Sequence, residues 1–290
     1  MSTHPVSVVI PAFESREHLA ANLPALIAEL DRRALGDEVI VVDDGGEDDL
    51  ESWIAATFPP SETFDSARAD VRVLRRKKNA GYARAALDGA RAAGHAHVLL
   101  LAPDVCVPAD FFEPLCAALA DPNVAAASPR IVHADGRGSP RIVWRSGLLE
   151  VEPGDAESLT PTDAEPIDAP YAPWCALLAR RDELIAAGLD TRFVPGDLAD
   201  VDLAWTWKKS GRRVVTVPRS VVERTPGEIA GIPAEFEPSL ALRNRLLLTW
   251  KHLDAPERRR EHVEALEAHA LDALLAGDRN RLLAIAAALD

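Results

Sequence analysis

Residues 38–49 read EVIVVDDGGEDD, and this stretch decides the fold class. Within Glu38–Val42 (EVIVV), the unbroken apolar run VIVV is typical of a strand that is buried on both faces, as in parallel sheets. Asp43-Asp44-Gly45-Gly46 ends the run with residues that favour turns. Similar apolar runs predict strands at 6–11, 71–74, 97–101 and 125–132. Apolar residues at helical spacing predict helices at 17–33, 50–57, 82–93 and 108–119. Strands that alternate with helices predict an α/β fold with a mostly parallel central sheet and helices on both faces.

The alternation weakens in the second half of the chain. Residues 59–70 read as a loop, and residues 133–170 are rich in Gly, Pro, Asp and Glu without a sustained period, so we expect loops there and one strand at 141–144. Regular elements return as strands at 175–178 and 213–217, helices at 181–187 and 201–209, a loop at 226–238, and helices at 239–252, 257–275 and 279–289. We expect one α/β domain over residues 1–238 and a C-terminal helical extension, residues 239–290, packed on it.

The C-terminal helices carry an apolar face at helical spacing. This face either joins two copies of the chain in a homodimer or covers the edge of the domain's own core, and the periodicity fits both. Its members are Leu266, Leu271, Leu274, Leu275, Leu282 and Leu283.

Composition excludes several classes of protein. The 290 residues include 46 Asp and Glu against 32 Lys and Arg, which gives a net charge of −14. We therefore expect no nucleic-acid partner, because such proteins usually present a basic face. Three cysteines without metal-ligand spacing indicate free thiols in a reducing compartment. With no signal-peptide pattern and no long apolar run, we expect a cytoplasmic protein, with peripheral attachment to the inner face of the membrane as a further option.

Polar segments follow the predicted strands where an open parallel sheet binds its ligands, beyond the carboxyl ends. One Asp after a strand is more often a turn or a helix cap than a binding group. The signal is the ordered recurrence of such segments, which lie at 11–14, 43–46, 77–81, 102–104 and 197–202.

In this order the segments resemble the family 2 inverting glycosyltransferases, which have the GT-A fold. The resemblance runs from Val6 to about Glu223. VSVVIPAFE (6–14) is similar to the family's first strand, and EVIVVDDGGEDD (38–49) to its second. KNAGYARAALDGARAAG (78–94), LLLAPDVCVPADFF (99–112), ARRDELIAAGLDTRF (179–193) and DLADVDLAWTWKKSGRRVVTVP (197–218) are similar to the later motifs. LALRNRLLLTWKHL (240–253) resembles a segment of rhamnosyltransferase-like members.

The resemblance implies roles for particular residues. Asp43 matches the residue that binds the nucleotide base, and Phe13 is placed to pack on the base face. Asp104 matches a metal ligand for Mg²⁺ or Mn²⁺, cations that favour oxygen ligands and stabilise a departing diphosphate. Asp200 matches the catalytic base, which removes the proton of the acceptor hydroxyl. The full substrate-binding set is Pro11, Phe13, Glu14, Asp43, Asp44, Asn79, Gly81, Arg84, Trp174, Asp202, Arg243 and Asn244.

Some of these residues also have simpler interpretations. Asp202 fits a solvated helix start, and Arg243 and Asn244 fit surface hydrogen bonding on an amphipathic helix. Trp174 fits a platform for an acceptor sugar, a plug in the donor-sugar position, or ordinary packing.

Six positions depart from the family's pattern. Each replaces a residue that lies in one of the motifs quoted above or close to one. The family's first metal-side Asp or Asn is Ala102 here, a motif Asn is Leu87, the Glu before the catalytic base is Ala199, an Arg is Thr206, and a Gly is Trp174. The family's metal-reaching His would fall near Glu223 and Arg224, neither of which is His.

Two functions remain in view. The first is a hexosyltransferase-type enzyme that moves a sugar, with inversion, from a UDP-, dTDP- or GDP-linked donor to a glycan, lipid-linked or small-molecule acceptor. The resemblance places this reaction in surface polysaccharide or glycoconjugate synthesis. The alternative, raised by the six departures, is a degenerate homologue with a non-catalytic binding or structural role.

Overall fold

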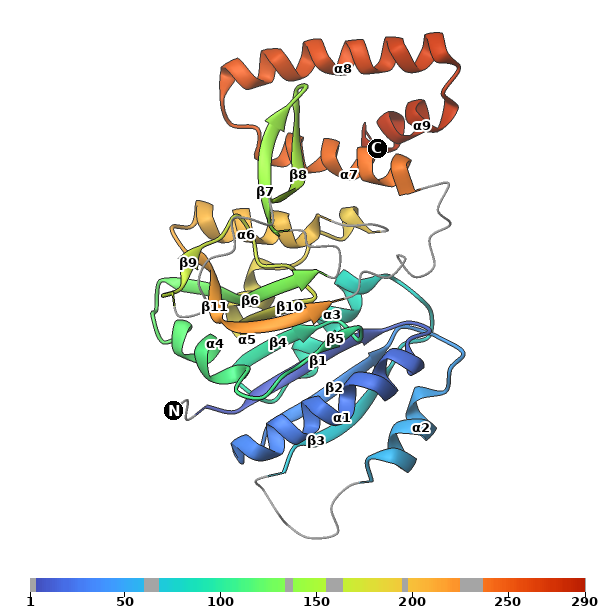
Figure 1. The fold of residues 1–290 in the computed structure, drawn as a ribbon. Helices are drawn as coiled ribbons and strands as arrows, with labels where there is room; N and C mark the ends of the chain where they lie inside the picture. Colours follow the sequence, from blue (N-terminus) through green and yellow to red (C-terminus); the bar gives the residue numbers. More distant parts are fainter. Residues whose placement is uncertain are drawn as a thin grey trace.

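The computed structural model describes residues 4–59, 68–133, 138–154, 164–194, 198–224 and 237–289. A nine-stranded sheet forms its centre (Figure 1), with the order β3-β2-β1-β4-β10-β6-β11-β5 and β9 beside β11. Four neighbouring strands are parallel, as the sequence predicts: β1 (Val6–Ala12), β2 (Glu38–Asp43), β3 (Asp70–Arg75) and β4 (His97–Leu101).

The second half of the sheet is mixed. β6 (Val124–His133) and β11 (Arg213–Arg224) are parallel to each other, and β10 (Ala176–Arg180) runs antiparallel to both β4 and β6. The short strands β5 (Val105–Cys106) and β9 (Ile167–Asp168) run antiparallel to β11. Six of the described strands therefore share one direction, so the prediction of a mostly parallel α/β sheet is confirmed.

Helices cover both faces of the sheet. One core contains residues from α1 (Arg16–Arg33), α2 (Leu50–Thr57) and α4 (Phe112–Ala118), and the other contains residues from α3 (Tyr82–Ala92), α5 (Arg181–Ala187) and α6 (Ala199–Lys209). Alternate residues of β1 supply the two cores: Val8 and Ile10 face the first, and Val9 faces the second. Each fully buried side chain of this size contributes about 1.5–3 kcal/mol, so the apolar strands hold both layers.

Three predicted elements differ from the structure. α4 begins at Phe112 rather than at Pro108, after Asp110 takes a positive φ of 60°. β11 does not stop at Val217 but continues to Arg224, and its register shifts between Val217 and Val221. The shift accommodates Pro218, which has no N–H to donate to the neighbouring strand.

The third difference lies in residues 133–170. Where one strand was expected, β7 (Gly138–Arg145) and β8 (Leu148–Gly154) form a hairpin, and β9 joins the main sheet. Ser146 and Gly147 make the turn, both with positive φ, as a two-residue hairpin turn requires. Within the predicted loops, residues 60–67, 134–137, 155–163 and 225–236 lie outside the described part of the chain.

The hairpin connects the sheet to the C-terminal helices α7 (Glu237–His252), α8 (Pro256–Ala276) and α9 (Arg279–Leu289), and Figure 1 shows it standing against them. The backbone N–H of Leu149 donates to Thr249 Oγ1 at 3.0 Å. At the hairpin turn, His262 Nδ1 lies 2.7 Å from the Gly147 carbonyl, and Trp250 Nε1 donates to His262 Nε2 at 2.6 Å. His262 is therefore a packing residue that fixes the hairpin turn on α8.

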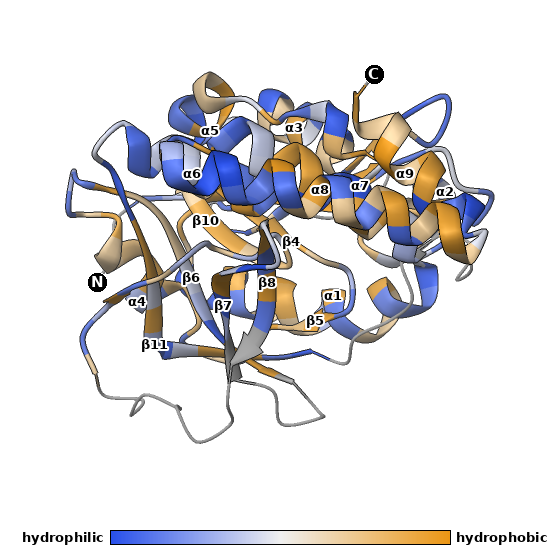
Figure 2. Ribbon diagram, turned by 90° about the horizontal axis from the view of Figure 1, so that it is seen from above, coloured by the Kyte–Doolittle hydropathy of each residue, from blue (hydrophilic) through white to orange (hydrophobic). Residues whose placement is uncertain are grey.

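The predicted apolar face of these helices is divided between two environments. Leu266 packs against the cluster formed by α7 and α9, and Leu282 is half-buried. Leu271, Leu274, Leu275 and Leu283 are exposed, with Leu275 at 78%. Figure 2 shows α8 as a helix of alternating apolar and polar segments. Among the described residues, no helix has both the length and the apolar character needed to cross a membrane.

Candidate functional site

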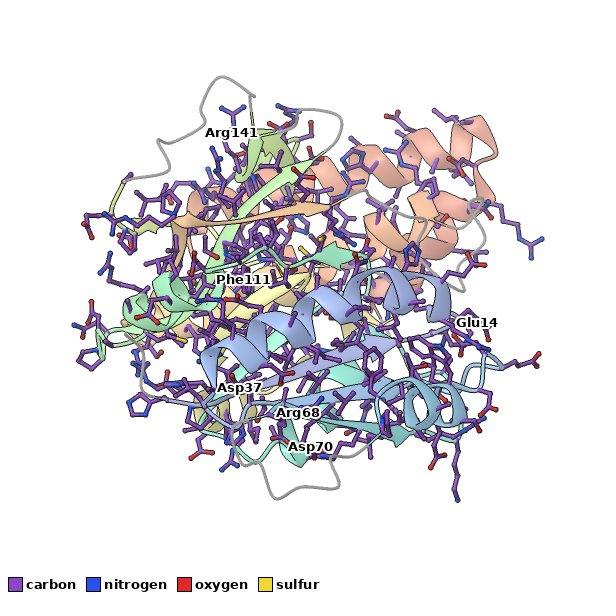
Figure 3. All side chains as sticks on the ribbon, turned by 60° about the horizontal axis from the view of Figure 1, so that its bottom comes forward. Glu14, Asp37, Arg68, Asp70, Phe111 and Arg141 are labelled. Atoms are coloured by element: carbon purple, nitrogen blue, oxygen red, sulfur yellow. The ribbon has the colours of Figure 1, made fainter. Side chains whose placement is uncertain are left out.

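The carboxyl ends of β1, β2 and β4 meet at one edge of the sheet. Ala12 pairs with Asp43, and Ala176, the first residue of the antiparallel β10, pairs with Leu101 at the end of β4. Trp174 and Cys175, which precede β10, therefore lie at this same edge. Figure 3 shows Glu14 at the right of the view, well separated from Asp37, which precedes β2. Asp43, Ala102 and Asp200, which come from three of the polar segments that the sequence singles out, therefore lie at this edge.

Asp43 shapes the loop after β2. Its Oδ1 accepts hydrogen bonds from the backbone N–H groups of Gly45 at 3.1 Å and Gly46 at 2.9 Å. Its Oδ2 is buried, lies 3.7 Å from Arg75 Nε, and has no hydrogen bond in the described part of the chain. One oxygen therefore builds the turn, and the other remains able to accept a hydrogen bond.

Asp44 was expected to bind substrate, but its carboxylate is enclosed by protein groups. It accepts hydrogen bonds from the N–H groups of Ala80, at 3.1 Å, and Gly81, at 2.8 Å, and Arg76 Nε lies 3.3 Å away. Burial raises the pKa of Asp44, an effect that these amides and Arg76 partly offset. We assign Asp44 to holding the 43–46 and 77–81 loops together.

Gly45 lies where these two loops approach most closely. Its φ is +82°, and a Cβ on it would lie 2.7 Å from Lys78 Cα. Gly211 has a similar φ of +80° with nothing within 4 Å of such a Cβ. We expect Gly211→Ala to cost about 1–2 kcal/mol in backbone strain. Gly45→Ala should cost a further 1–3 kcal/mol, roughly, because the backbone of Lys78 must move.

Urea unfolding of both glycine variants measures this difference. Equal losses of stability in Gly45→Ala and Gly211→Ala would show that the two loops do not meet as closely as described.

Asp104 follows β4 and forms an ion pair with the last residue of β11. Arg224 pairs with Val105 across the β5–β11 ladder, and its Nε donates to Asp104 Oδ2 at 3.0 Å. Asp104 Oδ1 is buried and has no hydrogen bond among the described residues. The extension of β11 beyond Val217, which the sequence did not predict, is what brings Arg224 to this carboxylate.

Asp200 lies in the first turn of α6, beside the segment that leads into β10. Its Oδ2 accepts the Trp174 N–H at 3.3 Å, and its Oδ1 accepts the Val201 N–H at 2.9 Å. Tyr82 Oη donates to the Trp174 carbonyl at 2.8 Å. One short stretch of backbone thus joins the start of α6, the start of α3 and the start of β10.

Cys175 and Tyr82 are close enough to both Asp104 and Asp200 to be affected by their charges. Burial raises the pKa of the Cys175 thiol to about 12, the positive charge of Arg224 opposes this shift, and the negative charges of Asp104 and Asp200 add to it. Burial likewise raises the pKa of Tyr82, with smaller effects from the same two carboxylates. Both groups are neutral at physiological pH, so Arg224, the ion-pair partner of Asp104, carries the positive charge in this part of the site.

Trp174 is buried against Tyr82, with ring centroids 5.6 Å apart and the rings nearly perpendicular. Of its three interpretations, this geometry favours packing over an exposed platform for a sugar.

Asp202 was also expected to bind substrate, and the structure gives it another environment. Its carboxylate is 4% exposed and meets two residues of α7: Lys251 Nζ donates to Oδ2 at 2.8 Å, and His252 Nε2 lies 2.7 Å from Oδ1. Lys251 also donates to Asp190, whose pKa is lowered by its hydrogen bond with Arg192 and by Lys251. Asp202 therefore joins α6 to the C-terminal helices.

The remaining candidates divide between backbone support and surface. Asn244 is fully buried, donates to the Phe193 carbonyl at 2.9 Å and accepts from Arg243 Nη1 at 2.9 Å. The other candidates lie at the same edge as Asp43. Pro11 is buried at the end of β1, Phe13 is half-buried, and Arg84 is exposed on α3. The Glu14 carboxylate accepts a hydrogen bond from the Glu47 N–H. The Asn79 side chain accepts one from the N–H of Gly81, whose φ is +86°.

The residues around Asp104 do not fit a divalent cation well. Such cations take several oxygen ligands and are usually held by one or two carboxylates together with substrate phosphates. Here Ala102 supplies no ligand, and the one carboxylate is already neutralised by Arg224. The described part of the chain holds no cluster of three or more His, Cys, Asp or Glu suited to a metal ion.

Three residues of this site were not among the predicted site residues. Arg224 was noted only as a departure, although a cation at a position near which the family has a metal-reaching His was a usable signal. Tyr82 and Cys175 carried no signal beyond their places beside Gly81 and Trp174, because their burial depends on how the loops close.

The mostly parallel α/β sheet with helices on both faces is a GT-A fold, and solved structures agree with this fold. Residues 7–181, more than half of the chain, match the sequence profile described as glycosyl transferase family 2. The chain belongs to this family, as the resemblance implied.

A curated relative is the pre-mycofactocin glycosyltransferase of Mycobacterium tuberculosis, which is 28% identical over 218 residues. These residues are 75% of this chain and 42% of the relative, so the chain spans less than half of that protein's length.

Two solved structures show the fold. A structure of GalNAc-T7 with UDP, GalNAc and Mn²⁺ matches with a TM-score of 0.65 at 18% identity, over 85% of this chain and 48% of that one. The mannosyltransferase PcManGT of Pyrobaculum calidifontis, in complex with GDP-Man and Mn²⁺, matches with a TM-score of 0.60 at 19% identity, over 99% and 86%.

Proposed function

We propose that this chain is a glycosyltransferase that moves a sugar from a nucleotide-diphosphate sugar to an acceptor hydroxyl with inversion. The observation that carries the proposal is the placement of Asp43, Asp104 and Asp200 at one edge of a GT-A sheet: Asp43 ends β2, Asp104 follows β4, and Asp200 accepts the N–H of Trp174, just before β10. Membership of glycosyl transferase family 2 supports it. The non-catalytic alternative is not favoured, because these three motif carboxylates are retained and lie together.

In the proposed reaction Asp200 is the catalytic base. The acceptor oxygen attacks the anomeric carbon while its proton passes to the Asp200 carboxylate. The bond between that carbon and the diphosphate oxygen breaks, and its electron pair leaves with the nucleoside diphosphate. Attack opposite the leaving group inverts the anomeric configuration.

Asp43 is the proposed contact for the nucleotide base. Its Oδ2 has no hydrogen bond in the described residues, so a base N–H would supply the missing donor. Phe13, which is half-buried three residues before the start of α1 at the same edge, would pack on the base face. The donor is a UDP-, dTDP- or GDP-linked hexose. Structural neighbours hold UDP, UDP-GlcNAc and GDP-Man.

The acceptor in this proposal is a glycan, a lipid-linked sugar or a small molecule in surface polysaccharide or glycoconjugate synthesis, made in the cytoplasm. We keep residues 1–238 as the catalytic domain and 239–290 as its extension, although α7 begins at Glu237, just before that boundary. The exposed leucines of α8 and α9 are the proposed contact in a homodimer, to be tested by sedimentation equilibrium of wild type and Leu275→Glu.

Isothermal titration calorimetry with UDP, dTDP and GDP tests the proposed function. We expect one nucleotide to bind in the micromolar range, and Asp43→Asn to weaken that nucleotide about tenfold, which corresponds to one hydrogen bond to a charged group. No heat from the folded protein with any nucleotide at millimolar concentration would contradict the proposal.

A further inference from the structure

The ion pair between Asp104 and Arg224 makes the surroundings of Asp104 different from a metal-binding site. β11 continues to Arg224 because its last two residues pair with β5, directly after Asp104 in the sequence. The pairing places the guanidinium Nε 3.0 Å from Asp104 Oδ2. A positive charge is thereby fixed beside the carboxylate that the family resemblance assigned to a cation.

Arg224 can still bind a ligand while it is held by Asp104. A guanidinium carries five N–H donors in a planar fork, and the Asp104 contact uses the Nε donor. The Arg224 side chain is 32% exposed, so a ligand can reach it. The fork matches the spacing of phosphate oxygens and binds them through two parallel hydrogen bonds.

We propose that Arg224, positioned by Asp104, binds the diphosphate of the donor and takes the place of a divalent cation. The proposal rests on the proposed function, because it names the group that receives the leaving diphosphate. As the sugar–oxygen bond breaks, its electron pair stays on the diphosphate, and the guanidinium stabilises the added negative charge. Asp104 is a positioning residue here, because it acts through Arg224.

Two further features favour this role over a purely structural ion pair. Asp104 Oδ1 is buried and has no hydrogen bond in the described residues, so the pair is incomplete without a further donor, such as a sugar hydroxyl. Cys175, which is buried, and Tyr82, which is half-buried, adjoin the pair and are neutral, so neither supplies a charge that competes with a diphosphate for Arg224.

Calorimetry on the full chain distinguishes Arg224 from a divalent cation as the positive charge that binds the diphosphate. Wild-type protein is titrated with the nucleoside diphosphate that binds, once in EDTA and once in excess Mn²⁺. We expect the two dissociation constants to agree within about threefold, because Arg224 is present in both conditions. This comparison needs no variant and therefore does not depend on how a variant folds.

Variants then test Arg224 itself. We expect Arg224→Gln to weaken the nucleoside diphosphate about 10- to 100-fold, the range for charge-assisted hydrogen bonds. The affinity for the matching nucleoside monophosphate should fall much less. General damage to the fold would weaken both nucleotides alike and would not produce this difference. The diphosphate affinity of Arg224→Lys should lie between those of wild type and Arg224→Gln, because lysine keeps the positive charge and loses the planar fork of donors. Arg219→Gln, an exposed position on the same strand, is the matched control and should bind as wild type.

Each result has a distinct meaning. Binding that requires Mn²⁺, with Arg224→Gln binding as wild type, would overturn the inference and leave the proposed function standing. No binding of any nucleotide in either condition would overturn both.

Discussion

Asp200→Asn should lower the rate of sugar transfer by roughly 10²–10⁴, the usual contribution of a positioned general base. The amide cannot take the acceptor proton, yet it has nearly the size of the carboxylate. Its oxygen can still accept the Trp174 or Val201 N–H, which now bind the carboxylate at 3.3 and 2.9 Å. Donor binding should therefore change little. The measurement is the rate of nucleoside diphosphate release from the donor, together with donor affinity by calorimetry.

Asp182→Asn is the matched control for this substitution. Asp182 is an exposed carboxylate on α5 beside Arg181, and its replacement should leave the rate within about twofold, as is typical of surface changes away from a site. A rate in Asp200→Asn equal to that of wild type would remove Asp200 from the role of base.

Asp202→Ala should destabilise the protein by roughly 1–3 kcal/mol, the cost of leaving the buried His252 nitrogen without its partner and of removing a hydrogen bond from the partly exposed Lys251. The Asp202 carboxylate and His252 are 4% and 3% exposed and 2.7 Å apart, and Lys251 completes the cluster at 2.8 Å. The loss should appear in urea unfolding, with α7 less protected in hydrogen exchange because the cluster ties it to α6.

Asp254→Ala provides the comparison on a similar ion pair at the surface. Asp254 is 73% exposed and meets Lys209 at the same 2.8 Å, so its removal should change stability little. If both substitutions changed stability equally, burial of the Asp202 cluster would not be what holds the C-terminal helices.

The sequence predicted the fold well where apolar runs decide the structure. The apolar residues of EVIVV and HVLLL are buried in strands whose alternate residues face the two cores, and the helix predicted at 50–57 is α2 without change. The prediction failed where long-range pairing decides. Nothing local in VVTVPRSVVER marks the strand that crosses Pro218, and only pairing with β6 and β5 extends it to Arg224.

The candidate site was predicted in outline, because the carboxyl ends of parallel strands must share an edge. Which carboxylates are enclosed could not be predicted. Asp44 and Asp202 belong to motifs just as Asp43 and Asp200 do, and only the packed structure shows Asp44 held by the Ala80 and Gly81 amides and Asp202 by Lys251 and His252. The pairing of Arg224 with Asp104 joins residues 120 positions apart, a contact that no local pattern reveals.

Early-time ¹H NMR of donor turnover tests whether sugar transfer is a single displacement with inversion in which Asp200 is the base. The protein is incubated with α-linked nucleotide sugars carrying the base that calorimetry selects, and the anomeric signals of the released sugar are followed before mutarotation. A single displacement assisted by Asp200 predicts that the β-anomer forms first and that Asp200→Asn forms almost none. Release of the α-anomer first, or no turnover of any donor that the protein binds, would contradict the account.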